Sequence, residues 1–349
     1  MTCIDVALIN YQDGGLRKDG GYDFRPLQRA FAVAPAPPAL ILFCEAKKYA
    51  DEAGVPMYGA AEALSDELGV PYSVDLGWMQ RGPMPPAVFW NPNVLTLRRW
   101  WRPGATGAYL DQVNVAKFAV VDSGATAAER AEFLAFVHHL SNVSGDDRLE
   151  EARRIGRYGS MQQLPVIGGG DFNSTASGKH LPQRRWEEAP FPSRRHKGML
   201  GPDGKWGPDT RAMDYLIGWW DKETGQRKDG AGLHAVAELA WRDDPSKLIV
   251  PTVNEGVDPG GELLIDYLLV NDAMLPSVIP GSYQVHIPDP SAPYPSDHRL
   301  VTMQLDLKFC RQPARQLPPE PAGAVTRDTD RPDVNAHPVP TVAAPTARR

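Results

Sequence analysis

Short apolar runs that end in a polar or charged residue recur along this chain of 349 residues, and they constrain its fold more than any other feature. Apolar runs of this length, bounded by turn signals, are typical of strands buried in an α/β core. Because α/β folds keep their chemistry where buried strands end, the terminal residues are candidates for one shared site. Five runs carry such residues at or near an end, namely Asn10, Glu45, His139, Asp171 with Asn173, and Asp297 with His298.

The most informative run is 164–168, which leads into Gly169-Gly170-Asp171-Phe172-Asn173. Residues two apart project to the same side of an extended backbone, so we expect Asp171 and Asn173 to face one ligand while Phe172 packs behind them. The glycines would let a phosphate or a metal ion approach the backbone. The alternative is an ordinary turn in which the Asp and Asn side chains bond their own backbone.

A further carboxylate, Asp266, lies inside the apolar run 263–270 rather than at its end. A buried carboxylate without a partner is costly. We therefore expect Asp266 to face a cation or a donor such as an imidazole.

The remaining pattern predicts an α/β chain of short strands and a few helices. Residues 133–140 fit either a strand or the end of a helix that begins at the capping box Thr126-x-x-Glu129. The runs 72–76, 87–90 and 94–97 are typical of adjacent antiparallel strands at a sheet edge. Further strands are expected at 4–9, 39–44, 118–121 and 300–307, and helical segments at 24–33, 56–68 and 144–155.

The chain is long enough for one large α/β domain, which we place at residues 1–310. Within it, residues 174–260 are charged and loop-rich, and we interpret them as an insertion around the mouth of the site. Residues 311–349 are rich in Pro, Ala, Arg and Asp and almost lack large apolar side chains, so we expect a disordered tail.

The charge balance limits the partners. The chain carries −6, and the tail contributes six Lys/Arg against four Asp/Glu, or +2, so residues 1–310 carry −6 − 2 = −8. An acidic domain is unsuited to coating long stretches of duplex, because Lys and Arg supply most non-specific affinity for nucleic acid. The Arg-rich runs 98–102, 184–185 and 194–197, with tryptophans among them, could still form a basic rim, or they could be solvated loops.

Three scattered cysteines, Cys3, Cys44 and Cys310, are too few for a disulfide framework or a zinc site and predict buried thiols. The sequence shows no basic, apolar leader pattern and no run long enough to cross a bilayer. We therefore expect a cytoplasmic protein without a membrane span, and a monomer by default.

Taken together, the motifs resemble the endonuclease/exonuclease/phosphatase superfamily, which has the DNase I-like fold. The resemblance covers about residues 4–307 and rests on four ordered signatures: the strand ending in Glu45, Gly170-Asp171-Phe172-Asn173, Ile265-Asp266-Tyr267 and Ser296-Asp297-His298. It implies an α/β fold of the α+β type, a four-layer sandwich of two packed, mostly antiparallel sheets flanked by helices. It also implies divalent-metal-dependent hydrolysis of phosphoester bonds.

The resemblance also implies a metal site. Mg²⁺, or Mn²⁺ in its place, prefers hard oxygen ligands and keeps several waters, so one or two carboxylates suffice. Glu45 would be the principal ligand, with Asn10 beside it and Asp297 contributing.

The same resemblance implies roles for the other residues. Asp171 would orient or deprotonate the attacking water, and Asn173 would hold a phosphoryl oxygen. His298, held by Asp266 through its second ring nitrogen, would donate to the phosphate, and His139 would aid the phosphate or the leaving group.

Two positions depart from the family pattern. Cys44 stands where a glutamine usually precedes the metal-binding glutamate, and Leu264 stands where an arginine is common. Neither change removes a ligand. Three functions remain open: a nuclease or phosphodiesterase acting on DNA or RNA, a hydrolase of a small-molecule or lipid phosphoester, and a catalytically silent relative that only binds.

Overall fold

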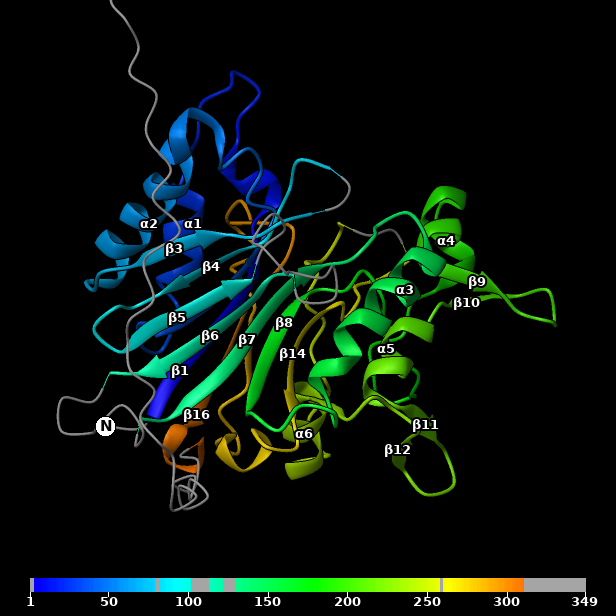
Figure 1. Ribbon diagram of the computed structural model, residues 1–349. Helices are drawn as coiled ribbons and strands as arrows, with labels where there is room; N and C mark the ends of the chain where they lie inside the picture. Colours follow the sequence, from blue (N-terminus) through cyan, green and yellow to red (C-terminus); the bar gives the residue numbers. More distant parts are fainter. Residues whose placement is uncertain (1–2, 80–81, 102–112, 122–129, 258–259, 311–349) are drawn as a thin grey trace, which may run out of the picture. The chain divides into compact units, whose positions relative to one another are not determined.

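Two six-stranded sheets form the centre of the described part of the chain (Figure 1). The computed structural model describes residues 3–79, 82–101, 113–121, 130–257 and 260–310, which belong to one compact unit, Met1–Gln312. The expected tail at 311–349 and the capping box at 126–129 lie outside the described residues.

The first sheet has the strand order β15-β16-β1-β2-β4-β3 and the second the order β13-β14-β8-β7-β6-β5. The pairs β1·β2 and β7·β8 are parallel, and the other neighbouring pairs are antiparallel. The strands of the first sheet are β1 Cys3–Asn10, β2 Leu40–Cys44, β3 Ser73–Leu76, β4 Ala87–Trp90, β15 Gln284–His286 and β16 Leu300–Asp306. Those of the second are β5 Leu95–Trp101, β6 Val115–Val120, β7 Glu132–His139, β8 Val166–Asp171, β13 Leu233–Ala235 and β14 Asp266–Asn271.

Three apolar clusters separate four layers. Alternate residues of a strand face opposite sides of its sheet, and β1 shows the consequence. Val6 and Leu8 lie in the cluster between the sheets, whereas Ala7 and Ile9 pack toward α1 (Arg25–Phe31) and α2 (Val55–Leu68). The outer face of the second sheet packs against α3 (Gly145–Ile155) and α5 (Arg211–Ile217). This arrangement confirms the predicted four-layer sandwich.

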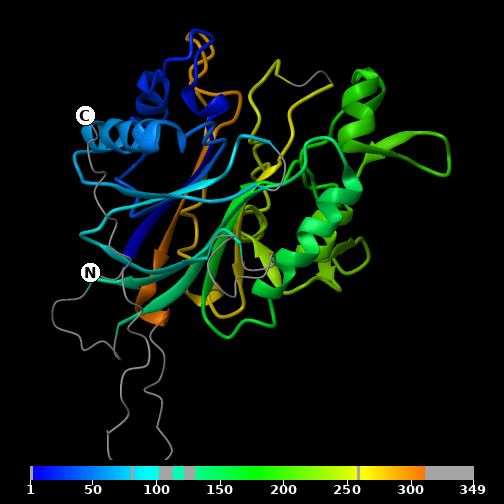
Figure 2. The ribbon, with the colours of Figure 1, turned by 45° about the horizontal axis from the view of Figure 1, so that its top comes forward.

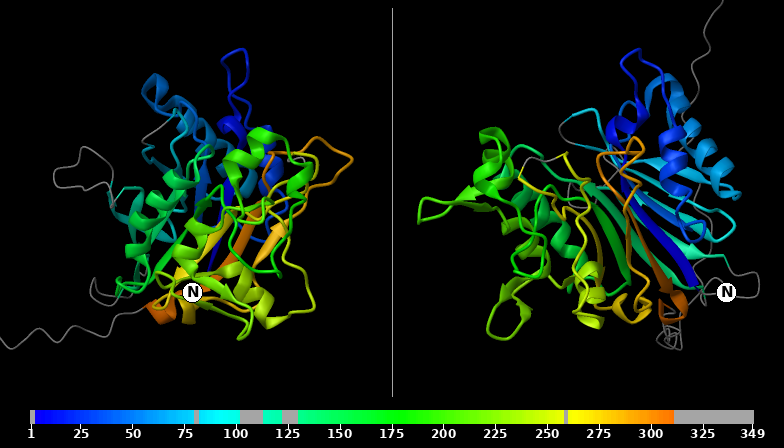
Figure 3. Two further views of the ribbon diagram at one scale, coloured as in Figure 1. Left: turned by 90° about the vertical axis from the view of Figure 1, so that its right-hand side faces the viewer. Right: turned by 180° about the vertical axis from the view of Figure 1, so that it is seen from behind.

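Residues 174–260 contain more regular structure than the loop-rich pattern indicated. Their elements are α4 Phe191–Lys197, β9 Gly198–Leu200, β10 Trp206–Pro208, α5, β11 Trp219–Asp221, β12 Gln226–Lys228, β13 and α6 Val236–Asp243. Strand β13 joins the second sheet, while α4 and the β9–β10 hairpin project beyond it (Figures 2 and 3). The 3-10 turns of the chain are η1 Gln12–Gly15, η2 Asp51–Gly54, η4 Gly156–Tyr158, η5 Trp186–Glu188, η6 Leu275–Ser277 and η7 Leu307–Cys310.

Four local expectations need a decision or a correction. Residues 132–139 form strand β7, and not a helix end. Strand β5 is not adjacent to β4, because the turn at 91–93 carries the chain from the first sheet to the second. Cys44 and Cys310 are buried, but Cys3 is exposed because β1 begins there at the surface. Asp266 begins β14 instead of interrupting it, since the backbone of Leu263 pairs with residues 252 and 253.

None of the helices in the described segments is both long and apolar enough to cross a bilayer.

The glycines of β8 allow neighbouring side chains to pack closely against its backbone, and a substitution at Gly168 tests this packing. Gly168 pairs with Phe136 across β7 and β8, and a Cβ at Gly168 would lie 2.2 Å from atoms of the fully buried Phe136 ring. We expect Gly168→Ala to lower the free energy of unfolding by about 1–3 kcal/mol, because the ring has no free space to enter. Urea denaturation measures the change.

The control is Gly207→Ala in β10, where a Cβ would meet no atom within 4 Å. Its effect should stay within about 0.5 kcal/mol. In a Phe136→Leu background the Gly168 substitution should cost less, because the ring is gone. Equal effects of the two glycine substitutions would contradict the packing argument.

Candidate active site

Three polar side chains meet at one level of the second sheet because of the strand register. Asp171, the last residue of β8, pairs with His139 of the parallel strand β7 on one side and with Asp266 of the antiparallel strand β14 on the other. The C-terminal end of β8 therefore lies between the end of β7 and the start of β14. The sequence predicted a shared functional site at such strand ends.

The first sheet supplies its residues at the adjoining edge. Asn10 ends β1 and pairs with Cys44, which ends β2 directly before Glu45. The Ser296 hydroxyl donates a hydrogen bond of 2.7 Å to the Asn10 carbonyl, which fixes the loop that carries Asp297 and His298. Residues from four distant parts of the sequence are thus held at one edge.

The Asp171 carboxylate lies at the centre of these residues. Its Oδ2 accepts a hydrogen bond from Asn10 Nδ2 at 3.0 Å and lies 3.5 Å from His139 Nε2 and 3.9 Å from His298 Nε2. Its Oδ1 accepts from the Asn173 backbone N–H at 2.7 Å. Burial raises the pKa of Asp171, but His298, His139 and Lys197 outweigh burial and the net pKa is lowered. The group is therefore an ionised acceptor.

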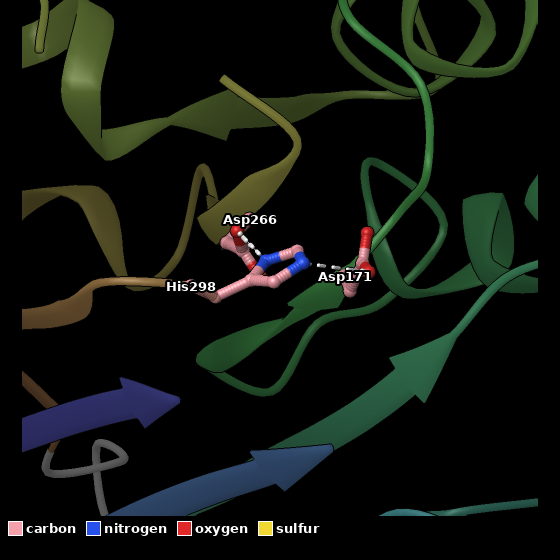
Figure 4. A group of neighbouring side chains, drawn as sticks. All are labelled: Asp171, Asp266 and His298. Atoms are coloured by element: carbon pink, nitrogen blue, oxygen red, sulfur yellow. Dashed lines mark hydrogen bonds and ion pairs between the residues drawn. The ribbon is translucent and has the colours of Figure 1, made fainter. Parts of the chain in front are cut away.

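His298 lies between two carboxylates (Figure 4). Its Nδ1 is 2.7 Å from Asp266 Oδ2, so its Nε2 faces Asp171. Burial lowers the pKa of His298, but Asp266 and then Asp171 raise it to about 10. Burial also raises the pKa of Asp266 against the opposing effect of His298. Since imidazole is the stronger base of the two, the proton of the pair resides on His298.

His139 also points at this centre and does not face solvent. Its side chain is 8 % exposed, and Nδ1 is buried without a hydrogen-bond partner. The neighbouring His138 is different, because burial alone lowers its pKa to about 4 and keeps the ring neutral. Of the two histidines, only His139 lies within ion-pair distance of Asp171 in the described structure.

Glu45 leaves β2 in the left-handed conformation, with φ of 67°. Its Oε2 accepts a hydrogen bond from the Asp13 backbone N–H at 2.8 Å, and a Cβ at Gly14 would lie 2.6 Å from its carbonyl oxygen. The glycine loop after β1 therefore wraps closely around this residue. Burial raises the pKa of Glu45, His139 opposes the rise, and Asp297 and Asp171 add to it. Glu45 is thus close to the other acidic residues in a region that favours a cation.

Asn173 differs from its expected geometry. Strand β8 ends at Asp171, and Asn173 has φ of 48°, so the two side chains do not share one face of an extended strand. The bond from Asn173 N–H to Asp171 is the turn considered as the alternative. Its side-chain Nδ2 donates to the Leu140 carbonyl at 3.1 Å, and Phe172 is fully buried behind, as expected.

Two cationic residues lie near the site: Arg148, which the sequence did not single out, and Lys197, which belongs to the basic run at 194–197. Arg148 of α3 is 1 % exposed, donates to the Ser141 carbonyl at 3.0 Å and lies 3.9 Å from Asp209 Oδ2. Lys197, at the end of α4, contributes to the low pKa of Asp171. The sequence offers no local signal that distinguishes Arg148, because tertiary packing is what buries it.

The donor set fits a hard divalent cation. Asn10 is 1 % exposed, and its Oδ1 is buried without a hydrogen-bond partner, so this oxygen is available as a ligand. The Asp171, Asp266 and His298 ligand atoms also lie within 4.8 Å of one another and could hold a metal ion. Because the Asp266–His298 bond occupies one atom of each residue, the oxygens of Asn10, Glu45 and Asp297 are the better match to Mg²⁺ chemistry.

Comparison with solved structures identifies the fold. A humanized D. rerio TDP2 carrying 14 mutations matches with a TM-score of 0.50 at 12 % identity, over 87 % of this chain and 99 % of that chain. An endonuclease/exonuclease/phosphatase from Bacteroides vulgatus matches with a TM-score of 0.52 at 14 % identity, over 87 % and 99 %. No family model matches the sequence, and no curated protein matches it. The likeness is one of fold, and it confirms the predicted DNase I-like fold.

The Asp266–His298 pair generates a pH prediction for the metal-free protein. The pKa of His298 is about 10 in the folded protein and about 6.5 when unfolded, so its stabilising effect is complete below about pH 6.5. That stability is lost as the pH rises toward 10. We expect the imidazole to stay protonated at pH 8, and Asp266→Asn to lower its pKa. Ring-proton NMR titration with chelator present measures both.

The matched control is Asp272→Asn, which removes the carboxylate 2.7 Å from the more exposed His234. This change should leave the His298 titration where it is. An unmodified protein whose His298 titrates near pH 6.5 would show that the buried ion pair does not form.

Proposed function

We propose that this chain, which has the DNase I-like fold, is a divalent-metal-dependent phosphodiesterase that cleaves nucleic acid by in-line attack of water. The observation that carries the proposal is the Asp171 carboxylate, which accepts a hydrogen bond from Asn10 and lies close to both His139 and His298. Phosphoester hydrolysis needs an oriented water, a donor to the phosphoryl oxygens and neutralisation of their charge. The site offers a candidate for each need.

The metal would be Mg²⁺, with Mn²⁺ as a substitute, held by Glu45 and Asn10 with a contribution from Asp297. When bound, it would neutralise charge on the phosphoryl oxygens and on the leaving oxygen. The buried, unpartnered Oδ1 of Asn10 and the position of Glu45 close to Asp297 and Asp171 support this placement.

The chain's own residues would orient the water and donate protons. Asp171, ionised because of its cationic neighbours, would accept the hydrogen bond of the attacking water and orient it in line. His298, which stays protonated because Asp266 pairs with its Nδ1, would donate from Nε2 to a phosphoryl oxygen. His139 would act on the same phosphate or on the leaving group, and the second N–H of the Asn173 amide would hold a phosphoryl oxygen.

Basic and aromatic residues beside the site favour nucleic acid as the substrate class. Helix α4 has Arg194, Arg195, His196 and Lys197 in its last turn and buries none of its residues. The guanidinium of Arg194 lies 5.9 Å from the Trp206 ring centre, and basic and aromatic side chains together are typical of surfaces that follow a phosphate backbone. They support the basic rim expected from the run at 194–197. In the run at 184–185, Arg184 is buried against the buried Trp186 and only Arg185 is exposed.

A substrate panel with and without chelator tests the proposal. The purified protein with excess Mg²⁺ would be assayed on plasmid, single-stranded DNA, RNA, and small phosphate monoesters and diesters. We expect nucleic-acid cleavage that chelation abolishes. Cleavage confined to small or lipid esters would favour the second hydrolase class, and no cleavage of any substrate would favour a silent relative.

Substitution of the central residues provides a second test. Asp171→Ala and His298→Ala should each lower kcat at least about 10²-fold, because each removes a group that orients or donates in the transition state. The control Asp203→Ala removes an exposed carboxylate at the tip of the β9–β10 hairpin and should leave kcat unchanged. Comparable rates for all three variants would exclude this site as the catalytic centre.

Glu45 allows the metal site to be tested without activity. We expect Mg²⁺ to raise the melting temperature of the unmodified protein, because a ligand that binds only the folded state stabilises it. Glu45→Gln should abolish most of this rise, since it removes the principal anionic ligand. Glu62→Gln, at an exposed position of α2, is the matched control and should keep the full response. A full Mg²⁺ response in Glu45→Gln would place the metal elsewhere.

A further inference from the structure

A cavity of about 340 Å³ begins beside the candidate active site. Its lining includes Thr175, two residues after Asn173, and Leu263, three residues before Asp266. Consecutive Cα atoms are about 3.8 Å apart, so the Cα atoms of Thr175 and Asn173 lie within ~7.6 Å of each other. The cavity therefore adjoins the residue proposed to hold a phosphoryl oxygen.

This cavity differs from four others in the charged residues that line it. Its lining includes the cations Lys179, Arg184 and Lys222 and no carboxylate. Four other cavities in the described part of the chain each include a carboxylate, from Glu151, Glu238, Asp289, and Asp51 with Glu52. Arg184 is buried, whereas Lys179 and Lys222 are exposed, so in a domain that is acidic as a whole the two lysines form a local anion-attracting region.

The two lysines are available to a ligand. Lys179 and Lys222 are exposed, and neither forms an ion pair within the described structure. Asp214 is not a lining residue, but its carboxylate accepts a hydrogen bond from the hydroxyl of Ser177, which is one. An ion pair of 3.3 Å with Arg227 compensates that carboxylate, so it does not cancel the lysines.

Four residues form an apolar part of the lining. Pro182, Trp186, Pro208 and Leu263 contribute to it. Arg184 lies over the Trp186 ring and donates to Ser193 Oγ at 3.0 Å, which fixes that wall. A nucleotide matches both the positive charge of the lysines and the apolar part of the lining, because it joins an anionic phosphate to a flat, largely apolar base. A cavity of this volume also falls in the usual range for small-molecule sites, about 300–1,000 Å³.

We propose that this cavity binds one nucleotide of a single-stranded nucleic acid next to the scissile phosphate. Lys179 and Lys222 would contact its phosphate, and the apolar wall would receive its base. A strand carries a phosphate on every nucleotide, so one strand can occupy both places. A paired and stacked base in a duplex is not free to enter. This inference rests on the proposed function and narrows its substrate class to single strands.

Binding measured with chelator present tests the cavity without turnover. The probe is a fluorescent oligonucleotide of twelve nucleotides, as DNA and as RNA, followed by anisotropy between 50 and 300 mM salt. Each phosphate contact on a single strand contributes a slope of about −0.7 to log K against log [salt]. Because both lysines would contact one phosphate, the double variant Lys179→Gln/Lys222→Gln should flatten the slope by about 0.7 and weaken binding at low salt. Lys247→Gln, whose side chain is 81 % exposed in the loop after α6, should keep the original slope.

Competition experiments test the base. A nucleoside monophosphate should displace the oligonucleotide at least tenfold better than inorganic phosphate from the unmodified protein, because only the nucleotide carries a base. In the double variant both competitors should bind more weakly, because both lose the lysine contacts to phosphate. Circular-dichroism melting curves establish that all variants are folded.

An unchanged salt slope in the folded double variant overturns the inference, and so does equal competition by inorganic phosphate. Hydrolysis of bis(p-nitrophenyl) phosphate by the unmodified protein with Mg²⁺ is measured separately. Its absence would count against the proposed hydrolase, while the binding data would still decide whether the cavity receives a nucleotide.

Discussion

The buried carboxylate of Asp171 is the constraint on which the site depends. An ionised carboxylate is costly to bury unless donors and positive charges surround it. Here the donors come from both sheets, since Asn10 ends a strand of the first sheet while His139 belongs to the second. Cys44 adds a contact between the sheets, because its Sγ accepts from the Asp171 backbone N–H at 3.4 Å. The contacts that compensate the buried charge of Asp171 therefore connect the ends of the two sheets.

Close backbone packing makes this arrangement possible. Gly170 has a positive φ, and a Cβ there would lie 1.7 Å from the His138 carbonyl oxygen, so a side chain has no space. The glycines that the sequence suggested as an approach for ligand instead allow β7 and β8 to lie close together. Cys44 is fully buried in the cluster between the sheets, where its side chain is small enough for the gap.

Charge is distributed unevenly over the domain, and this matters for the substrate. The acidic total disfavours extended duplex binding, yet Lys197 acts on Asp171, and Lys179 and Lys222 line the adjoining cavity. These cations lie in residues 174–260, a segment with short helices and hairpins beside the sheets. The proposed catalytic residues and the cations proposed to bind the substrate therefore belong to different parts of the chain. A catalytic centre built on strand ends can keep its geometry while the flanking segment determines what reaches it.

The sequence by itself determined the strands and the residues at their ends, because apolar runs and terminal polar residues are local signals. Asn10, Glu45, Asp171, Asp266 and His298 were all predicted from such signals, and a buried Asp266 was expected to face a cation or a donor such as an imidazole. Tertiary structure alone decided which polar groups meet. The turn at 91–93 looks like a hairpin but joins two sheets, Arg148 is buried without any local signal for it, and Asn173 adopts a left-handed turn. These outcomes depend on register and packing between segments far apart in the chain, and a local pattern carries no information about either.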